Sequence, residues 1–138
     1  MKITLIFMKA LFVAILFCPL MLLAQDMQVK TIKFETGKSS ATVTDAITGY
    51  QTIDYKISAS AGQSLKVKLK TSNASNNFNV LPPGSEDDAI YNGSIEGTSY
   101  TGKLQQTGDY KIRVYLMRND ARRNATANYT LTVSITSE

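Results

Sequence analysis

"SLKVKLK" (residues 64–70) alternates without a break between apolar and basic side chains. Because successive side chains of a strand point to opposite faces, the stretch predicts a strand that buries Leu65, Val67 and Leu69 and leaves its lysines in water. The same period of two recurs in three further stretches, "TIDYKISA" (52–59), "DYKIRVYL" (109–116) and "NYTLTVSI" (128–135). One buried and one solvated face per strand is typical of antiparallel sheets, so the pattern predicts an all-β protein.

Turn signals separate these stretches at short intervals: Gly37, Gly49, 60–63, 82–84, Gly97 and 107–109. No stretch after the N-terminal region keeps the 3.6-residue period of a helix. We therefore predict an antiparallel two-sheet β-sandwich of about eight or nine short strands, in one domain over 25–138. In the least regular segment, 71–93, we expect a short strand at "FNVLP" (78–82) and a surface loop over 83–88.

The N-terminus (1–24) has the pattern of a secretory signal peptide. Lys2 and Lys9 give a basic start, an apolar run follows over 11–23, and Ala24 ends it with a small side chain. The run is short for a membrane span, although a retained anchor is the alternative interpretation. We expect removal after Ala24, no membrane span afterwards, and a periplasmic or secreted location.

Charge and composition exclude several classes of function. Removal of 1–24 takes away two of the 15 basic residues and none of the 11 acidic ones, so the net charge falls from +4 to +2, too weak a balance for nucleic-acid binding. The chain has no histidine, and its one cysteine, Cys18, lies in the expected signal. Glu86, Asp87 and Asp88 could bind Ca²⁺, but they lack the spacing of a calcium loop, which favours a solvated acidic loop. We expect no enzyme activity, no cofactor and no metal site.

"LMRNDARRN" (116–124) places three arginines, Arg118, Arg122 and Arg123, between two well-patterned strands. A tight hairpin would use Asn-Gly or a related pair here. The simpler interpretation is that these charges only keep a loop soluble. The alternative is an anion-binding loop, because the planar guanidinium group suits bidentate contact with a carboxylate.

Two stretches resemble the periplasmic inhibitors of animal lysozymes, small secreted bacterial proteins that block g-type and i-type lysozymes. The first is "TGDYKIRVYLMRNDARRNATANYTLTV" (107–133), in which "RNDARRN" is the most specific part. The second is "GKSSATVTDAITGYQTIDYKISASAGQSLKVKL" (37–69), and together they span most of the chain after the signal. Shorter pieces of the pattern also occur in β-sandwiches of the pre-peptidase C-terminal type.

The resemblance implies that loop residues enter the substrate cleft of the lysozyme. The family motif Ser-Gly-x-Tyr corresponds to Thr107, Gly108 and Tyr110, with threonine in place of serine. Two arginines four residues apart correspond to Arg118 and Arg122, and a family tyrosine corresponds to Tyr50. An inserted guanidinium group would pair with the catalytic carboxylate. Tyr110 is in phase with buried residues of its strand, so the core is as good a place for it as a contact.

The leading hypothesis is therefore an inhibitor whose partner is an animal lysozyme, g-type in preference to i-type. A glycan-binding module of the pre-peptidase C-terminal type is the alternative, with Tyr50, Tyr91, Tyr100 and Tyr115 in place of the missing tryptophan. A structural envelope protein is the third hypothesis. Unpaired edge strands leave a homodimer open.

Overall fold

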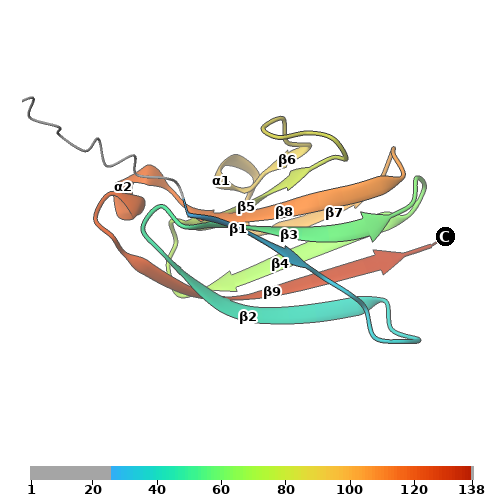
Figure 1. The fold of residues 1–138 in the computed structure, drawn as a ribbon, viewed down its shortest axis with the longest axis horizontal. Helices are drawn as coiled ribbons and strands as arrows, with labels where there is room; N and C mark the ends of the chain where they lie inside the picture. Colours follow the sequence, from blue (N-terminus) through green and yellow to red (C-terminus); the bar gives the residue numbers. More distant parts are fainter. Residues whose placement is uncertain (1–25, 138) are drawn as a thin grey trace, which may run out of the picture.

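The computed structural model describes residues 26–137, so the predicted signal peptide and Cys18 lie outside the described residues. Residues 26–137 form nine strands and two one-turn helices (Figure 1). In chain order these are β1 (Met27–Thr31), β2 (Ser40–Thr48), β3 (Thr52–Ala59), β4 (Ser64–Thr71), β5 (Asn76–Leu81), β6 (Tyr91–Asn92), α1 (Gly93–Glu96), β7 (Ser99–Lys103), β8 (Gly108–Leu116), α2 (Arg118–Ala121) and β9 (Thr126–Thr136).

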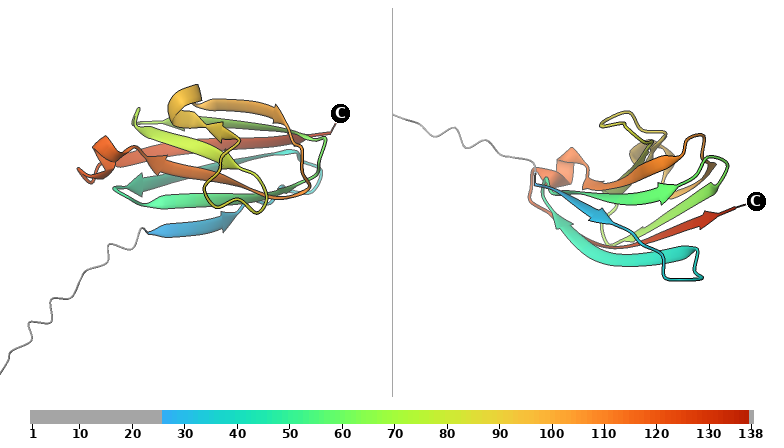
Figure 2. Two further views of the ribbon diagram at one scale, coloured as in Figure 1. Left: turned by 90° about the horizontal axis from the view of Figure 1, so that it is seen from above. Right: turned by 45° about the vertical axis from the view of Figure 1, so that its right-hand side comes forward.

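The strands form two sheets that face each other (Figures 1 and 2). One sheet has the order β1-β3-β8-β5-β6 and the other the order β2-β9-β4-β7. Neighbours pair antiparallel, except that β1 lies parallel to β3, with Met27 opposite Thr52. The predicted antiparallel two-sheet β-sandwich is confirmed.

The core lies between the sheets and follows the alternation of the sequence. Leu65 and Val67 of β4 are fully buried, and so are Leu131 and Val133 of the neighbouring β9. Two buried tyrosines from opposite sheets meet in the core, where the hydroxyls of Tyr55 and Tyr129 share a hydrogen bond of 2.6 Å. Burial raises the pKa of both phenols, so the pair stays neutral across the physiological pH range.

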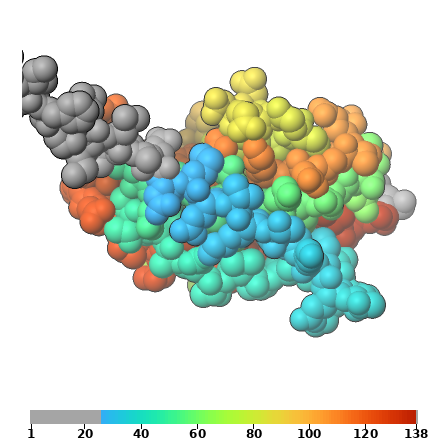
Figure 3. Space-filling view, viewed as in Figure 1, coloured from blue at the N-terminus to red at the C-terminus, as the bar shows by residue number. Residues whose placement is uncertain are grey.

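The irregular segment contains more structure than its sequence predicts. β5 begins at Asn76, two residues before the predicted strand, because the Asn76 side-chain amide donates to the backbone oxygen of Tyr115 on β8 at 3.0 Å. The loop after β5 folds back over the outer face of the five-stranded sheet. The space-filling view shows the β5–β6 region above β1, which crosses the front of the molecule (Figure 3). No helix within residues 26–137 has the length and apolar character needed to cross a membrane.

Candidate functional site

The connection between β8 and β9 is an anchored turn of helix, where the sequence predicted a loop. Ala121 of α2 is buried, which holds the turn against the end of the sandwich. The backbone N–H of Met117 donates to the backbone oxygen of Ser75 at 2.8 Å, so the connection is also tied to the β4–β5 turn. Asn124 ends the turn with a φ of 55°, a left-handed conformation that asparagine tolerates. The three arginines therefore sit on a fixed support.

Arg123 stabilises the turn, whereas Arg118 and Arg122 face solvent. Arg123 bonds the carboxylate of Asp120 within the same turn, and this contact lowers the pKa of Asp120. Arg118 and Arg122 are one helical turn apart, with the Arg122 N–H donating to the Arg118 backbone oxygen at 3.1 Å. Residues four apart share one side of a helix. Both are exposed, and neither forms an ion pair within residues 26–137.

The β2–β3 turn brings Tyr50 to the same end of the molecule. The N–H of Gly49 donates to the backbone oxygen of Ala125 at 2.9 Å, which joins this turn to the α2 connection. Gly49 has a φ of +62°, a left-handed conformation that favours glycine, and a Cβ there would lie 2.6 Å from Oδ1 of Asn124, so that side chain would have to move. Tyr50 follows with 48% of its surface exposed. The structure thus gathers Tyr50, Arg118 and Arg122 on two loops in mutual contact.

A hollow of about 290 Å³ opens beside Tyr50 on the outer face of the five-stranded sheet. The remaining residues that line it come from β1, the β2–β3 turn, β3, β5 and β8: Met27, Gln51, Thr52, Asn79, Arg113, Tyr115 and Leu116. The Tyr115 hydroxyl donates to Oδ1 of Asn79 at 3.1 Å, which fixes one wall. The sequence did not predict the hollow, because the parallel pairing that brings Met27 beside β3 leaves no local pattern.

Thr107, Gly108 and Tyr110 lie at the opposite end of the sandwich from Arg118. Gly108 begins β8 and Arg118 follows its end, and at about 3.3 Å per residue the strand spans roughly 26 Å. The register confirms this arrangement, because Gly108 pairs with Ala59 at one end of β3. The six residues predicted from the resemblance therefore form two groups, which cannot enter one narrow cleft together.

The Thr107 group is engaged within the protein itself. Tyr110 is 1% exposed, and its hydroxyl donates to the backbone oxygen of Gln106 at 2.7 Å, so the core placement holds and its side chain is closed to a partner. The Thr107 hydroxyl accepts from the Ala61 N–H at 2.9 Å and joins two turns. A Cβ at Gly108 would lie 2.9 Å from Cβ of Pro83, so glycine allows the β5–β6 loop to approach β8. Of these residues, only Thr107 is exposed.

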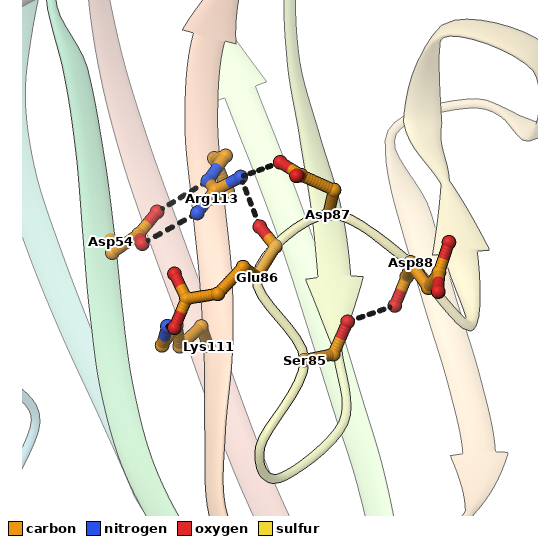
Figure 4. A network of polar contacts seen from close by, with 7 residues as sticks. All are labelled: Asp54, Ser85, Glu86, Asp87, Asp88, Lys111 and Arg113. Carbon is orange, nitrogen blue, oxygen red and sulfur yellow. Dashed lines mark hydrogen bonds and ion pairs between the residues drawn. The ribbon is translucent and has the colours of Figure 1, made fainter.

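Arg113, which lines the hollow, belongs to a clamp that the sequence did not predict (Figure 4). The pattern of β3 places Asp54 on the solvent face, yet its side chain is only 2% exposed. Arg113 donates two hydrogen bonds to the Asp54 carboxylate, from Nε to Oδ1 at 2.7 Å and from Nη2 to Oδ2 at 2.9 Å. This contact raises the pKa of Arg113, so its charge is permanent.

The acidic loop completes the clamp. Nη1 of Arg113 donates to the backbone oxygen of Glu86 at 2.9 Å and lies 3.8 Å from Oδ1 of Asp87. Nζ of Lys111 reaches the Glu86 carboxylate at 3.3 Å. The predicted surface loop over 83–88 is therefore present, and Lys111 and Arg113 of β8 hold it against the five-stranded sheet. Within the described residues, no group of acidic side chains has an arrangement that could hold a metal ion.

Comparisons with known proteins agree on one kind of relative. No protein-family model matches the chain. A protein of Escherichia coli (strain K12) described as an inhibitor of g-type lysozyme is 31% identical over 112 residues, which is 75% of this chain and 78% of that protein. The crystal structure of Aeromonas hydrophila PliG, a periplasmic inhibitor of g-type lysozyme, has a TM-score of 0.74 and 35% identity, over 80% of this chain and 98% of that one.

Two further structures show how far the similarity extends. Salmonella Typhimurium PliG, also a periplasmic inhibitor of g-type lysozyme, has a TM-score of 0.59 and 28% identity, over 79% of this chain and 98% of that one. The pre-peptidase C-terminal domain of a Bacillus anthracis collagenase has a TM-score of 0.51 at 12% identity, over 81% of this chain and 96% of that one. The collagenase domain is therefore similar in fold alone.

Proposed function

The chain belongs to the family of periplasmic inhibitors of g-type lysozyme, a family of inhibitors rather than enzymes, and from this premise we propose how it acts. It resides in the periplasm and binds g-type lysozyme with the end of the sandwich that carries Tyr50, Arg118 and Arg122. These three residues enter the substrate cleft and exclude the glycan. We call this surface the arginine end.

The observation that carries the proposal is the pair of exposed guanidinium groups on an anchored turn. Arg118 and Arg122 have no ion-pair partner within the described residues, whereas Arg123 beside them is bonded to Asp120. A lysozyme cleft contains a catalytic carboxylic acid in a partly apolar setting. A guanidinium group that enters such a cleft gains a charge-assisted hydrogen bond to that acid.

The anchoring of α2 supports tight binding. A flexible arginine loop would lose conformational freedom on binding, which weakens association. Here Ala121 is buried, and the Met117 and Gly49 N–H groups are bonded to neighbouring turns, so the backbone is already ordered. Loss of one partner from a desolvated interfacial charge pair costs about 2–5 kcal/mol, so one arginine carries a large part of the affinity.

Tyr50 has the properties of a residue that anchors a protein–protein interface, and the hollow beside it can receive a side chain of the partner. Tyrosine is frequent among residues that dominate interface energies, because it buries a large ring at low entropic cost. Met27 and Leu116 add apolar surface to the hollow, while Gln51 and Asn79 add polar groups. A protruding side chain from the rim of the lysozyme cleft fits this mixture. We assign the hollow to the same interface.

For i-type lysozyme, the other target class that the resemblance implies, we propose the opposite end of the sandwich as the contact surface. Its motif, Thr107-Gly108-Asp109-Tyr110, ends in a buried tyrosine, and Thr107 is exposed. If this end is used, Thr107→Ala impairs inhibition of i-type lysozyme and leaves inhibition of g-type lysozyme intact.

A homodimer that forms through the edge strands would be detected as a doubled molecular mass in solution.

The glycan-binding alternative has less support from the described residues. It needs flat, exposed aromatic rings, but Tyr91 is buried and packs against Tyr100, with ring centroids 5.0 Å apart. Phe78 stacks on the other side of Tyr91, at 5.2 Å. These rings therefore complete the core beside α1.

The test is a cell-wall lysis assay with protein purified from the periplasm. It is titrated against goose-type, invertebrate-type and chicken-type lysozymes in parallel, and we expect near-stoichiometric inhibition of the goose-type enzyme. Arg118→Ala and Arg122→Ala are expected to weaken it by about 30-fold or more each, the equivalent of roughly 2 kcal/mol. Lys38→Ala removes one charge from an exposed site at the opposite end and serves as the matched control. Full inhibition by the double arginine variant would contradict the proposal.

A further inference from the structure

The charged residues on the outer face of the four-stranded sheet are all basic, and they lie on β4 and β7. This face presents Lys66, Lys68 and Lys70 from β4 and Lys103 from the neighbouring β7, all exposed. We call this surface the lysine face. Successive lysines of β4 are two residues apart, so their Cα atoms are spaced by about 6.7 Å along the strand.

The lysine face carries no opposing charge. No aspartate, glutamate or aromatic residue occupies an outward position of β2, β9, β4 or β7. The other outward residues are Ser, Thr and Asn, with Ala46 as the one apolar exception. Some hydroxyls pair across strands, such as Thr48 with Thr126 at 2.8 Å and Ser40 with Ser134 at 3.1 Å. Within residues 26–137, none of the four lysines forms an ion pair.

The usual structural reasons for strand lysines do not explain this pattern. Lysines on an edge strand prevent pairing with other chains, which accounts for Lys103 on β7, but β4 lies between β9 and β7 and is not an edge. Solubility is served by charges of both signs, interspersed over a surface. The outer face of the other sheet shows that mixture, with Asp54 and the acidic loop beside Lys111 and Arg113. Like charges at close spacing repel one another, so the lysine face is suited to an anionic partner.

From this surface we propose a second interaction: the lysine face docks on a bilayer that contains anionic phospholipid. The face is broad and belongs to a regular sheet, which matches a planar array of phosphate groups. Lysine acts as a compact point charge and needs no fixed partner geometry, whereas arginine suits bidentate recognition. The absence of aromatic rings from the face disfavours glycans and single-stranded nucleic acids, whose binding uses stacking. The absence of large apolar side chains restricts contact to the headgroups.

Such docking leaves the arginine end free. Arg118 begins α2 and Arg122 directly follows it, whereas the lysines lie along β4 and β7. Figure 2 shows α2 at one end of the sandwich. The inhibitor would thus be held at a membrane surface with its lysozyme-binding end exposed at the side. The inference does not depend on the proposed function, because different residues carry the two interactions.

The test is co-sedimentation of protein purified from the periplasm with lipid vesicles. Vesicles of phosphatidylethanolamine and phosphatidylglycerol are compared at low salt with neutral vesicles of phosphatidylcholine. Each lysine near an anionic bilayer strengthens binding about fivefold, so the triple variant Lys66→Thr, Lys68→Thr and Lys70→Thr should bind about a hundredfold more weakly. Threonine suits a strand and already occupies the neighbouring positions. The matched control, Arg118→Gln, Arg122→Gln and Arg123→Gln, removes the same charge from the arginine end.

We expect each variant to lose one of the two interactions and to keep the other. The lysine variant loses vesicle binding and keeps inhibition of lysozyme, whereas the arginine variant loses inhibition and keeps vesicle binding. High salt releases the wild-type protein from vesicles, because exposed charges are screened. The proposal is overturned if the wild type ignores anionic vesicles, if both variants lose binding equally, or if the protein sediments with purified cell-wall sacculi and not with vesicles.

Discussion

Asp54→Asn tests the clamp between β3 and β8 with almost no change in shape. The substitution removes the negative charge and turns one acceptor of Arg113 into a donor. Two bonds of 2.7 and 2.9 Å are affected, and the side chains are only 2% and 15% exposed. Breaking a buried ion pair costs about 3–5 kcal/mol, because one charge remains without its partner. Arg113 keeps the Glu86 carbonyl and has Asp87 nearby, so we expect the lower end, about 3 kcal/mol.

The assay is urea unfolding followed by circular dichroism. With a slope near 1.5 kcal/mol/M, a loss of about 3 kcal/mol lowers the midpoint by about 2 M, and the melting temperature falls by roughly 10 °C. Glu35→Gln is the control, because its pair with Lys38 is 79% and 67% exposed and is worth about 0.5 kcal/mol or less. The double substitution Asp54→Leu with Arg113→Met should recover most of the loss, since neither charge is then stranded.

The reasoning is refuted if Asp54→Asn costs no more than Glu35→Gln. That result would mean that water reaches Arg113 freely and that the acidic loop does not cover it. The same loop bonds Arg113, which is one of the residues that line the hollow beside Tyr50. Inhibition of lysozyme by the variant therefore reports whether the clamp also shapes the proposed interface.

Three further predictions follow from single features. Gly49→Ala strains a turn with a φ of +62° and displaces the Asn124 side chain, so it should shift Tyr50 and reduce inhibition about tenfold, while Gly37→Ala, which has a similar φ of +79° but nothing within 4 Å, should leave inhibition unchanged. Because burial raises the pKa of Tyr55 and Tyr129 above the unfolded value of about 10, stability is complete below about pH 10 and falls as the unfolded tyrosines ionise at higher pH. Tyr129→Phe should reduce this alkaline slope by about 1.4 kcal/mol per pH unit, as measured by urea unfolding at a series of pH values. Intact-mass measurement of the exported protein should give the mass of residues 25–138, and a mass that includes the N-terminal segment would show that the segment is retained.

The sequence predicts the sandwich well because each strand carries its own alternation. Leu65 and Val67 are fully buried in β4, as the pattern of that strand alone requires. Asp54 shows where such reasoning fails, since its burial accompanies an ion pair with Arg113, 59 residues away in the chain. Local patterns give the face on which a side chain lies, but they do not show what covers that face. The parallel pairing of β1 with β3 is equally non-local and left no signal.

The sequence predicted which residues form the candidate site, but only part of how they are arranged in space. Arg118 and Arg122 are close in sequence, and Tyr50 joins them because the Gly49 turn packs on their connection. The phase of Tyr110 in its strand allowed both a core and a contact role, and the structure places it in the core. The separation of Thr107 from Arg118 follows from the length of β8, but the resemblance alone does not reveal it.

The position of the last strand governs when this chain can fold. β9 lies between β2 and β4, so the four-stranded sheet lacks its middle until the C-terminus is available. A chain that crosses a membrane from its N-terminus onward therefore remains incomplete until its final residues arrive. Pairing between such distant segments is slow to form. Truncation before β9 leaves β2 without a neighbour and β4 paired with β7 alone, instead of a smaller folded protein.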